Sequence, residues 1–233
     1  MPRKNTDASA DTLKLDAARR ALELVRPGMK VGLGSGTTAT LWIQLVGEQV
    51  RDHGLKIEAI ASSEDSEHLG RGFGIPFLTF DQFERLDLTV DGADEIAPGL
   101  ALIKGGGGKL LREKIVASAT DRFVIIADES KVVDKLGGFP LPVEVIPMAA
   151  NLVERQLENL GFQVEMRRSQ DGSRYITDEG NILYDCSGMM IDDPESLAAK
   201  LDRIVGVVEH GLFLKMASLA IIATGNGVRE RSR

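Results

Sequence analysis

Apolar residues in the first half of the chain follow two spacings, and their alternation predicts the order of helices and strands. The segment 12–26 places apolar side chains on one helical face and ends before Pro27-Gly28. Short apolar runs that predict strands then alternate with helical patterns, with strands at 29–33, 56–61, 86–91 and 123–128 and helices that end near 50 or span 64–73 and 109–119. This alternation predicts an α/β fold with a Rossmann-like, mostly parallel sheet flanked by helices.

The second half of the chain has a different rhythm. After Lys131 the patterns predict a strand, a helix, two strands, a helix and a strand, at 142–146, 147–160, 162–168, 181–186, 194–204 and 207–213. This β-α-β-β-α-β order is typical of a ferredoxin-like α+β domain. A last apolar run, 219–223, is expected to return to the first sheet. We therefore predict a discontinuous Rossmann-like domain, 1–135 and 214–233, with a smaller ferredoxin-like domain, 136–213, inserted into it.

Composition indicates a globular protein and limits the classes of partner that it is expected to bind. Of the 233 residues, 43% are hydrophobic and 27% are charged, which excludes a disordered chain, a coiled coil and a collagen-like fibre. A net charge of −7 disfavours a broad nucleic-acid surface. The polar segment 1–11 lacks the apolar core of a signal peptide, and no run reads as a membrane span. With Cys186 as its single cysteine, the chain is expected to be cytoplasmic, without a nucleic-acid or membrane partner.

A glycine-rich loop follows the first predicted strand. In Gly34-Ser35-Gly36-Thr37-Thr38, which lies between a strand and a helix, free backbone N–H groups attract phosphate and the side-chain hydroxyls add donors. Taken alone the loop is ambiguous, because Gly34-x-Gly36-x-x-Ala39 also fits the dinucleotide fingerprint. Both interpretations predict that a phosphate group binds here.

Acidic residues gather after the third predicted strand, in Asp91-Gly92-Ala93-Asp94-Glu95. In open parallel sheets, ligands bind beyond the carboxyl ends of the strands, so these carboxylates are placed to bind sugar hydroxyls, to transfer protons or to hold Mg²⁺. A solvated surface turn would explain the same residues. The three histidines, His53, His68 and His210, are scattered without ligand spacing, so no transition-metal site is predicted.

A run of four glycines forms the third motif, Lys104-Gly105-Gly106-Gly107-Gly108-Lys109. Four consecutive glycines are costly in conformational entropy, so they indicate a close approach of the backbone to a ligand. The run is not a P-loop, because Ile103 occupies the first glycine position and Leu110 replaces the Ser or Thr. In the helix that follows, Glu113 either interacts with the helix dipole or serves as a general base beside the acidic motif.

Together and in this order, the motifs resemble those of one family, ribose-5-phosphate isomerase of the A type. The resemblance runs from about residue 11 to residue 228. The segments that carry it are Gly34-Ser35-Gly36-Thr37-Thr38, Asp91-Gly92-Ala93-Asp94-Glu95, Lys104-Gly105-Gly106-Gly107, Arg112-Glu113-Lys114, Ala127-Asp128-Glu129-Ser130-Lys131 and Phe139-Pro140-Leu141-Pro142-Val143-Glu144-Val145-Ile146-Pro147. Two features depart from the family pattern: Lys109 stands where an uncharged residue is usual, and the final tail is short and Arg-rich.

The resemblance implies an enzyme that interconverts D-ribose 5-phosphate and D-ribulose 5-phosphate through an enediolate, in the non-oxidative branch of the pentose phosphate pathway, with no metal or other cofactor. It implies that the base is Glu113, which moves a proton between C1 and C2. Lys104 and the glycine-loop N–H groups would stabilise the oxyanion, and Asp91 and Asp94 would handle hydroxyl protons. The implied substrate contacts are Ser35, Gly36, Thr37, Thr38, Asp91, Gly92, Ala93, Asp94, Lys104, Gly105, Gly106, Gly107 and Lys131, and more weakly Lys14. The family also implies a homodimer or homotetramer that associates through the inserted domain.

Three other functions stay open at the level of the motifs. A dinucleotide-dependent dehydrogenase would use Gly34-x-Gly36-x-x-Ala39 and would need an acid such as Glu64 or Asp65 after the second strand. A non-catalytic sugar-phosphate sensor would keep the phosphate loop, but it has no need of the acidic motif, Lys104 and Glu113 together. A sugar-phosphate deaminase or lactonase would share the fold, but the motifs of those enzymes are not seen in the sequence.

Overall fold

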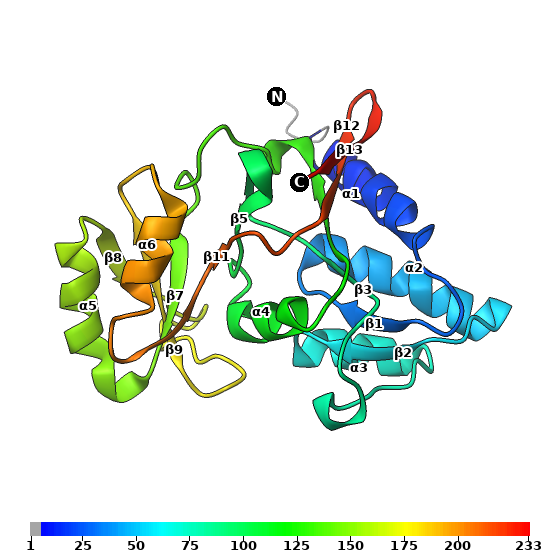
Figure 1. The fold of residues 1–233 in the computed structure, drawn as a ribbon, viewed down its shortest axis with the longest axis horizontal. Helices are drawn as coiled ribbons and strands as arrows, with labels where there is room; N and C mark the ends of the chain where they lie inside the picture. The colour runs from blue at the N-terminus through cyan, green and yellow to red at the C-terminus, as the bar shows by residue number, and fades with distance from the viewer. Residues whose placement is uncertain (1–5) are drawn as a thin grey trace.

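The structure, a computed structural model, describes residues 6–233 and is built around a six-stranded sheet (Figure 1). The strand order is β13-β12-β6-β3-β1-β2, and every neighbouring pair is parallel except β12 and β13. The strands are β1 (Lys30–Leu33), β2 (Glu58–Ala61), β3 (Leu88–Asp91), β6 (Phe123–Asp128), β12 (Leu219–Thr224) and β13 (Gly227–Ser232). The predicted first domain starts at residue 1, and its residues 1–5 lie outside the described residues.

Different layers cover the two faces of this sheet. Its helices are α1 (Thr6–Leu22), α2 (Thr37–His53), α3 (Glu64–Gly72) and α4 (Leu110–Ser118), with the short 3-10 turns η1 (Phe80–Gln82) and η3 (Glu129–Lys131). On the face of α1 and α2, Trp42 packs in one core with Val124 and Ile126 of β6. The alternate residues Phe123 and Ile125 belong to a second core on the opposite face. A strand that is buried on both faces explains why the apolar run of β6 is continuous.

The second face is covered by a small antiparallel sheet of order β11-β5-β4. Its strands are β4 (Glu95–Ala97), β5 (Ala101–Ile103) and β11 (Leu212–Phe213), and the turn η2 (Pro98–Leu100) joins the first two. Leu102 and Phe213 pack from this small sheet into the same core as Phe123. The small sheet and α4 therefore lie between the two lobes of the molecule (Figure 1).

The second lobe contains a four-stranded antiparallel sheet of order β10-β7-β9-β8 with α5 and α6 (Figure 1). Its elements are β7 (Leu141–Val145), the turn η4 (Pro147–Ala149), α5 (Ala150–Asn159), β8 (Gln163–Met166), β9 (Ile182–Ser187), α6 (Pro194–Leu201) and β10 (Val207–His210). Numbered within the lobe, the strand order is 4-1-3-2, which is the ferredoxin-like arrangement expected from the β-α-β-β-α-β pattern.

The predicted fold class is confirmed, and three elements differ from the pattern. The single strand predicted at 207–213 is wrong, because the chain turns at Gly211 and its last two residues join the small sheet as β11. The first helix ends at Leu22 rather than at residue 26. The helix expected from 147 begins as a 3-10 turn. The patterns predict no strand at β4, β5 or β13, since the first two are only three residues long and the third has no buried face.

The division of the chain into domains at residues 135/136 and 213/214 stays a prediction. Among the helices within residues 6–233, none is long and apolar enough to cross a bilayer.

Gly34, directly after β1, lies against the carboxyl end of β3. Its N–H donates to the Val90 carbonyl at 3.0 Å. A Cβ atom added there would lie 2.4 Å from Asp91 Oδ1 and 2.5 Å from Asp91 Cα. Because the nearest obstacle includes backbone, no side-chain rotation relieves the contact, and the first motif requires glycine at this position for packing.

We expect Gly34→Ala to lower the free energy of unfolding by at least about 2 kcal/mol, because overpacking at this point forces the two strand ends apart. Gly72→Ala is the matched control, since an added Cβ there meets nothing within 4 Å. That control should leave stability unchanged or raise it by up to about 1 kcal/mol. Urea unfolding of both variants measures the difference, and equal stability of the two would contradict the close approach.

Candidate active site

A cavity of about 1010 Å³ opens where β1, β3 and β6 end, and the loops after these strands line it. Ligands bind at this edge of open α/β sheets. Of the residues predicted to contact a substrate, those that line the cavity are Ser35, Gly36, Thr37, Thr38, Gly92, Ala93, Asp94, Lys104, Gly105, Gly106, Gly107 and Lys131, together with Lys14. Glu113 lines it as well, whereas Asp91 lies beneath the surface of the cavity and is 1% exposed.

The centre of the site is a buried ammonium between two carboxylates. Lys104, which follows β5 and is 2% exposed, places Nζ 3.0 Å from Asp91 Oδ2 and 3.3 Å from Glu113 Oε1. The same ammonium donates to the Gly92 carbonyl at 2.6 Å and lies 5.5 Å from the centre of the Phe213 ring. Burial lowers the pKa of Lys104, but the charges of Asp91 and Glu113 outweigh it and raise that pKa above its ordinary value. Lys104 is therefore a fixed positive charge at neutral pH.

Asp91 and Asp94 hold the surrounding loops in different ways. Asp91 Oδ1 accepts hydrogen bonds from the backbone N–H groups of Ser35 at 2.9 Å and Gly92 at 2.7 Å, so with Lys104 its carboxylate is fully engaged. Asp94 Oδ2 accepts from the Gly106 N–H at 2.7 Å and thereby ties the acidic motif to the glycine loop. Only Asp94 of the two faces the cavity, so it is the better placed to meet a substrate hydroxyl.

Glu113 has the chemistry of a base with a raised pKa. It lies in the first turn of α4, is 6% exposed, and its Oε2 has no hydrogen-bond partner among the described residues. Burial raises the pKa of Glu113 to about 8, against the attraction of the Lys104 ammonium. The single Lys104 ammonium lies beside both carboxyl groups, and Asp91 also accepts two backbone N–H groups. Asp91 is therefore the better stabilised of the two as a carboxylate. Of the two carboxyl groups beside Lys104, Glu113 therefore has the pKa that suits a general base near neutral pH.

The loop 34–38 presents the N-terminus of α2 to the cavity. Gly36 adopts a φ of +89° at the N-cap position and supplies no side-chain cap, so the first N–H groups of α2 stay available to an anion. Thr37 and Thr38 line the cavity beside them. Lys131 of η3 lines the same cavity and has no ion-pair partner within residues 6–233, whereas Lys14 of α1 lies 3.4 Å from Asp11.

Glu95 and Lys109, both singled out in the sequence, bind partners away from the centre of the cavity. Glu95, the last residue of the acidic motif, points away and accepts the backbone N–H groups of Gly137 at 2.8 Å and Phe139 at 2.7 Å. Lys109, which departs from the family pattern, lines the cavity rim and lies 2.5 Å from Asp178 in the loop between β8 and β9.

Sequence patterns missed two serines that line the cavity, Ser63 and Ser66, which reach it from the end of β2 and the start of α3. Asp65, named above only for a dehydrogenase, and Asp128, which lies in one of the family motifs, line the cavity as well. Ser35 Oγ lies 2.7 Å from Ser62 Oγ, which joins the loop after β1 to the loop after β2. Their position after parallel strands is a signal that the sequence does contain, but isolated serines do not stand out from those of ordinary turns.

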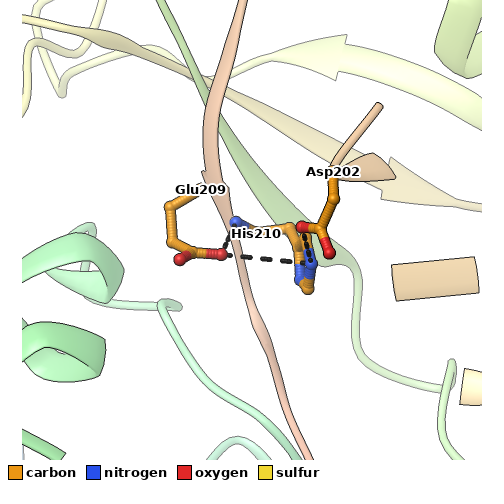
Figure 2. Close-up of side chains that lie close together, drawn as sticks. All are labelled: Asp202, Glu209 and His210. Atoms are coloured by element: carbon orange, nitrogen blue, oxygen red, sulfur yellow. Dashed lines mark hydrogen bonds and ion pairs between the residues drawn. The ribbon is translucent and has the colours of Figure 1, made fainter. Parts of the chain in front are cut away.

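A cluster of metal-ligand side chains lies elsewhere, at the end of β10 (Figure 2). His210 Nε2 is 3.2 Å from Asp202 Oδ1 and 3.9 Å from Glu209 Oε1. Lys114 Nζ already binds Glu209 Oε1 at 2.6 Å, and His210 Nδ1 accepts from the Leu212 N–H, so the neutral ring carries its proton on Nε2 toward Asp202. Burial lowers the pKa of His210 to about 4, and the Lys114 ammonium acts in the same direction. These groups already partner one another, and the cluster fastens α4 to β10.

The fold places a buried carboxyl group of raised pKa and a fixed ammonium beside an uncapped helix N-terminus. This arrangement suits an enzyme that transfers a proton on a small phosphorylated substrate, as an aldose–ketose isomerase does. The family model for ribose 5-phosphate isomerase A (phosphoriboisomerase A) matches residues 58–227. The ribose-5-phosphate isomerase A of Nitrobacter hamburgensis is 48% identical over 229 residues, which cover 96% of this chain and 98% of that protein.

Solved structures agree with the sequence relatives. Ribose 5-phosphate isomerase A from Methanocaldococcus jannaschii superposes with a TM-score of 0.92 at 40% identity, over 96% of this chain and 99% of that one. A D-ribose-5-phosphate isomerase in complex with phospho-erythronic acid gives 0.93 at 35% identity with the same coverage. The chain belongs to the ribose 5-phosphate isomerase A family, and the prediction of a sugar isomerase is confirmed.

The raised pKa of Glu113 predicts how isomerase activity depends on pH. A base works only in its deprotonated form, so kcat/KM should fall about tenfold per pH unit below a pKa near 8 and level off above it. Initial rates between pH 5.5 and 9.5 measure this profile. A rate that is already constant from pH 6 upward would contradict a raised pKa in the free enzyme.

The raised pKa of Glu113 also predicts that the free energy of unfolding falls as the pH rises, whereas kcat/KM increases. A carboxyl group whose folded-state pKa exceeds its unfolded value stabilises the protein below about pH 4.5, and this contribution is lost as the pH rises through about 8. Glu113→Gln removes that loss, so at pH 8.5 the variant should unfold at the same denaturant concentration as the wild-type protein or a higher one. This control separates lost chemistry from lost folding.

Proposed function

We propose that the cavity binds D-ribose 5-phosphate and D-ribulose 5-phosphate and that Glu113 moves the proton between C1 and C2. The observation that carries this proposal is the Lys104 ammonium held between Asp91 and Glu113 at the cavity wall. It places a proton acceptor and a fixed positive charge within one hydrogen-bond distance of each other. A substrate whose C1 and C2 lie beside Glu113 has its oxygens within reach of Lys104.

The proton transfer balances without an added reagent. Glu113, as carboxylate, removes the proton from C2 of the open-chain aldose, and the C1 carbonyl oxygen takes up the negative charge of an enediolate. Lys104 stabilises that charge, and Glu113 returns the proton to C1 while the O2 hydroxyl proton passes to O1, which gives the ketose. Asp94 faces the cavity and handles the hydroxyl protons, including those of ring opening. Asp91 acts through Lys104, because its oxygens are engaged within the protein.

The phosphate is proposed to lie at the start of α2. The free N–H groups after Gly36 and the hydroxyls of Thr37 and Thr38 supply hydrogen bonds, and Lys131 supplies a positive charge without a competing carboxylate in the described chain. The glycine loop and Glu113 line the same cavity, so one pentose phosphate would reach both ends of the site. A phosphorylated acid such as phospho-erythronic acid, which is bound by a solved relative, carries a carboxylate that mimics the enediolate oxygens.

The wider setting of the activity follows from the family. We propose that the protein acts in the cytoplasm, in the non-oxidative branch of the pentose phosphate pathway, on a free sugar phosphate and without a nucleic-acid or membrane partner. No step in the proton transfer above calls for a metal ion or an organic cofactor.

Glu113→Gln tests the proposed base. The amide keeps the size of the side chain but accepts no proton, so kcat should fall about 10²–10⁴-fold while KM changes little. Solvent-deuterium exchange into the C1/C2 position of the sugar measures the proton transfer directly. Glu67→Gln is the matched control, because Glu67 also lies in the first turn of a helix but pairs with Arg71 and does not line the cavity. If Glu113→Gln exchanges that proton at the wild-type rate, Glu113 is not the base.

The ferredoxin-like lobe also offers a surface for a second copy of the chain. Met148 is 95% exposed and Val205 is 82% exposed, and Ile146 and Leu152 beside them are about half exposed. The Ile146 N–H donates to the Gly206 carbonyl at 3.0 Å, which brings the turn before β10 against the start of α5. We call these four side chains the apolar patch and propose that it forms the contact of a homodimer or homotetramer.

Met148→Glu combined with Val205→Glu should shift the protein to a monomer, because two facing copies would bring four carboxylates together in a desolvated contact. Light scattering at micromolar concentration measures the mass. Phe80→Glu, at an exposed apolar position of the other lobe, is the control and should leave assembly unchanged. An unaltered oligomer in the double variant would place the contact elsewhere.

A further inference from the structure

The ferredoxin-like lobe reaches the glycine loop through one arginine. Arg167, which directly follows β8, donates from one guanidinium nitrogen to the carbonyls of Gly105 at 2.9 Å and Gly106 at 3.1 Å. The hydroxyl of Tyr175 lies 3.4 Å from the next carbonyl, that of Gly107. Three successive carbonyls of the loop therefore point toward this lobe and away from the cavity.

The direction of these carbonyls fixes the direction of the N–H groups. A trans peptide unit is planar, and its N–H points opposite to its C=O. The N–H of Gly106 shares a plane with the Gly105 carbonyl, and it donates to Asp94 on the cavity side at 2.7 Å. The N–H of Gly107 shares a plane with the Gly106 carbonyl, so it also faces the cavity side. It has no acceptor within the described part of the chain, and Gly107 lines the cavity.

Arg167 is itself held rigidly. Its Nε donates to Asp185 Oδ2 at 2.8 Å, and a second nitrogen pairs with Asp185 Oδ1, so the guanidinium and the carboxylate of β9 form a two-pronged ion pair. The Tyr175 ring lies 6.0 Å from the guanidinium. The Arg167 side chain is 14% exposed and does not line the cavity. It touches the loop from behind and cannot touch a substrate in the cavity.

We propose that Arg167 is a positioning residue for the isomerase reaction: by holding the Gly105 and Gly106 carbonyls, it keeps the Gly106 N–H on Asp94 and aims the Gly107 N–H at the cavity, where that N–H completes the oxyanion site of Lys104. Inside the loop the Gly108 N–H donates to the Gly105 carbonyl at 2.9 Å, whereas the Gly106 carbonyl accepts from Arg167. Glycine has no side chain to fix a peptide plane, so the plane between Gly106 and Gly107 depends on this contact from outside the loop. The inference rests on the proposed function, since it assigns Arg167 to the enediolate stage of that reaction.

Arg167→Met tests the proposal because it keeps the aliphatic stem and removes both carbonyl contacts. A displaced oxyanion donor should lower kcat about 10- to 100-fold and leave KM for ribose 5-phosphate within about threefold, because the phosphate is held elsewhere. Binding of phospho-erythronic acid should weaken by a factor similar to the loss in kcat, whereas binding of inorganic phosphate should not change. Arg168→Met is the matched control, since its guanidinium donates to Gly172 within the same hairpin.

The measurements on Arg167→Met distinguish a positioning role of Arg167 from a purely structural one. If Arg167→Met lowers only the midpoint of unfolding, or raises KM while kcat is kept, Arg167 is structural and the inference is wrong. If that variant does not fold, Arg167→Lys is used, because lysine keeps the charge but cannot pair with Asp185 and span both carbonyls; a wild-type kcat in it would also refute the inference. A wild-type enzyme that does not isomerise ribose 5-phosphate would refute the proposed function itself.

Discussion

The buried ammonium of Lys104 is the interaction on which the rest of the site depends. An unpaired charge at 2% exposure would cost several kcal/mol, so carboxylates must reach it from β3 and from α4. Pairing this ammonium brings two strand ends and a helix terminus close together. At two positions where the backbone passes close to these groups, Gly34 and Gly211, there is no space for a side chain. A Cβ atom at Gly34 would meet Asp91, and one at Gly211 would lie 2.3 Å from the Lys104 carbonyl oxygen.

The same arrangement explains why Glu113 has a raised pKa although a lysine lies beside it. The single positive charge is shared, and Asp91 holds it with two backbone N–H groups in support. Glu113 keeps one oxygen without a hydrogen-bond partner among residues 6–233, in a desolvated position where ionisation is costly. The protein thus places two neighbouring carboxyl groups in different environments: one fixes the ammonium, and the other has the raised pKa that the proposed proton transfer requires.

Most of the fold and the centre of the site follow from local sequence signals. The strand order of the ferredoxin-like lobe follows from its β-α-β-β-α-β pattern, and the loops after β1, β3 and β5 carry glycines and acids at the strand ends where ligands bind in such sheets. The contact of Arg167 with the glycine loop could not be predicted from local signals, because it joins residues about 60 positions apart in the sequence. The strands β4 and β5 are likewise too short for any periodicity.

The place of Glu95 and Gly211 has an evolutionary consequence. The chain enters the ferredoxin-like lobe through Gly137 and Phe139, whose N–H groups bind Glu95, and it leaves through Gly211, whose carbonyl accepts the Lys104 N–H at 2.9 Å. Both crossings are thus fastened to the short segment that carries the central lysine. Exchanging this lobe for another by recombination would remove the hydrogen bonds that hold this segment at both crossings, so we expect such an exchange to require compensating changes around Lys104.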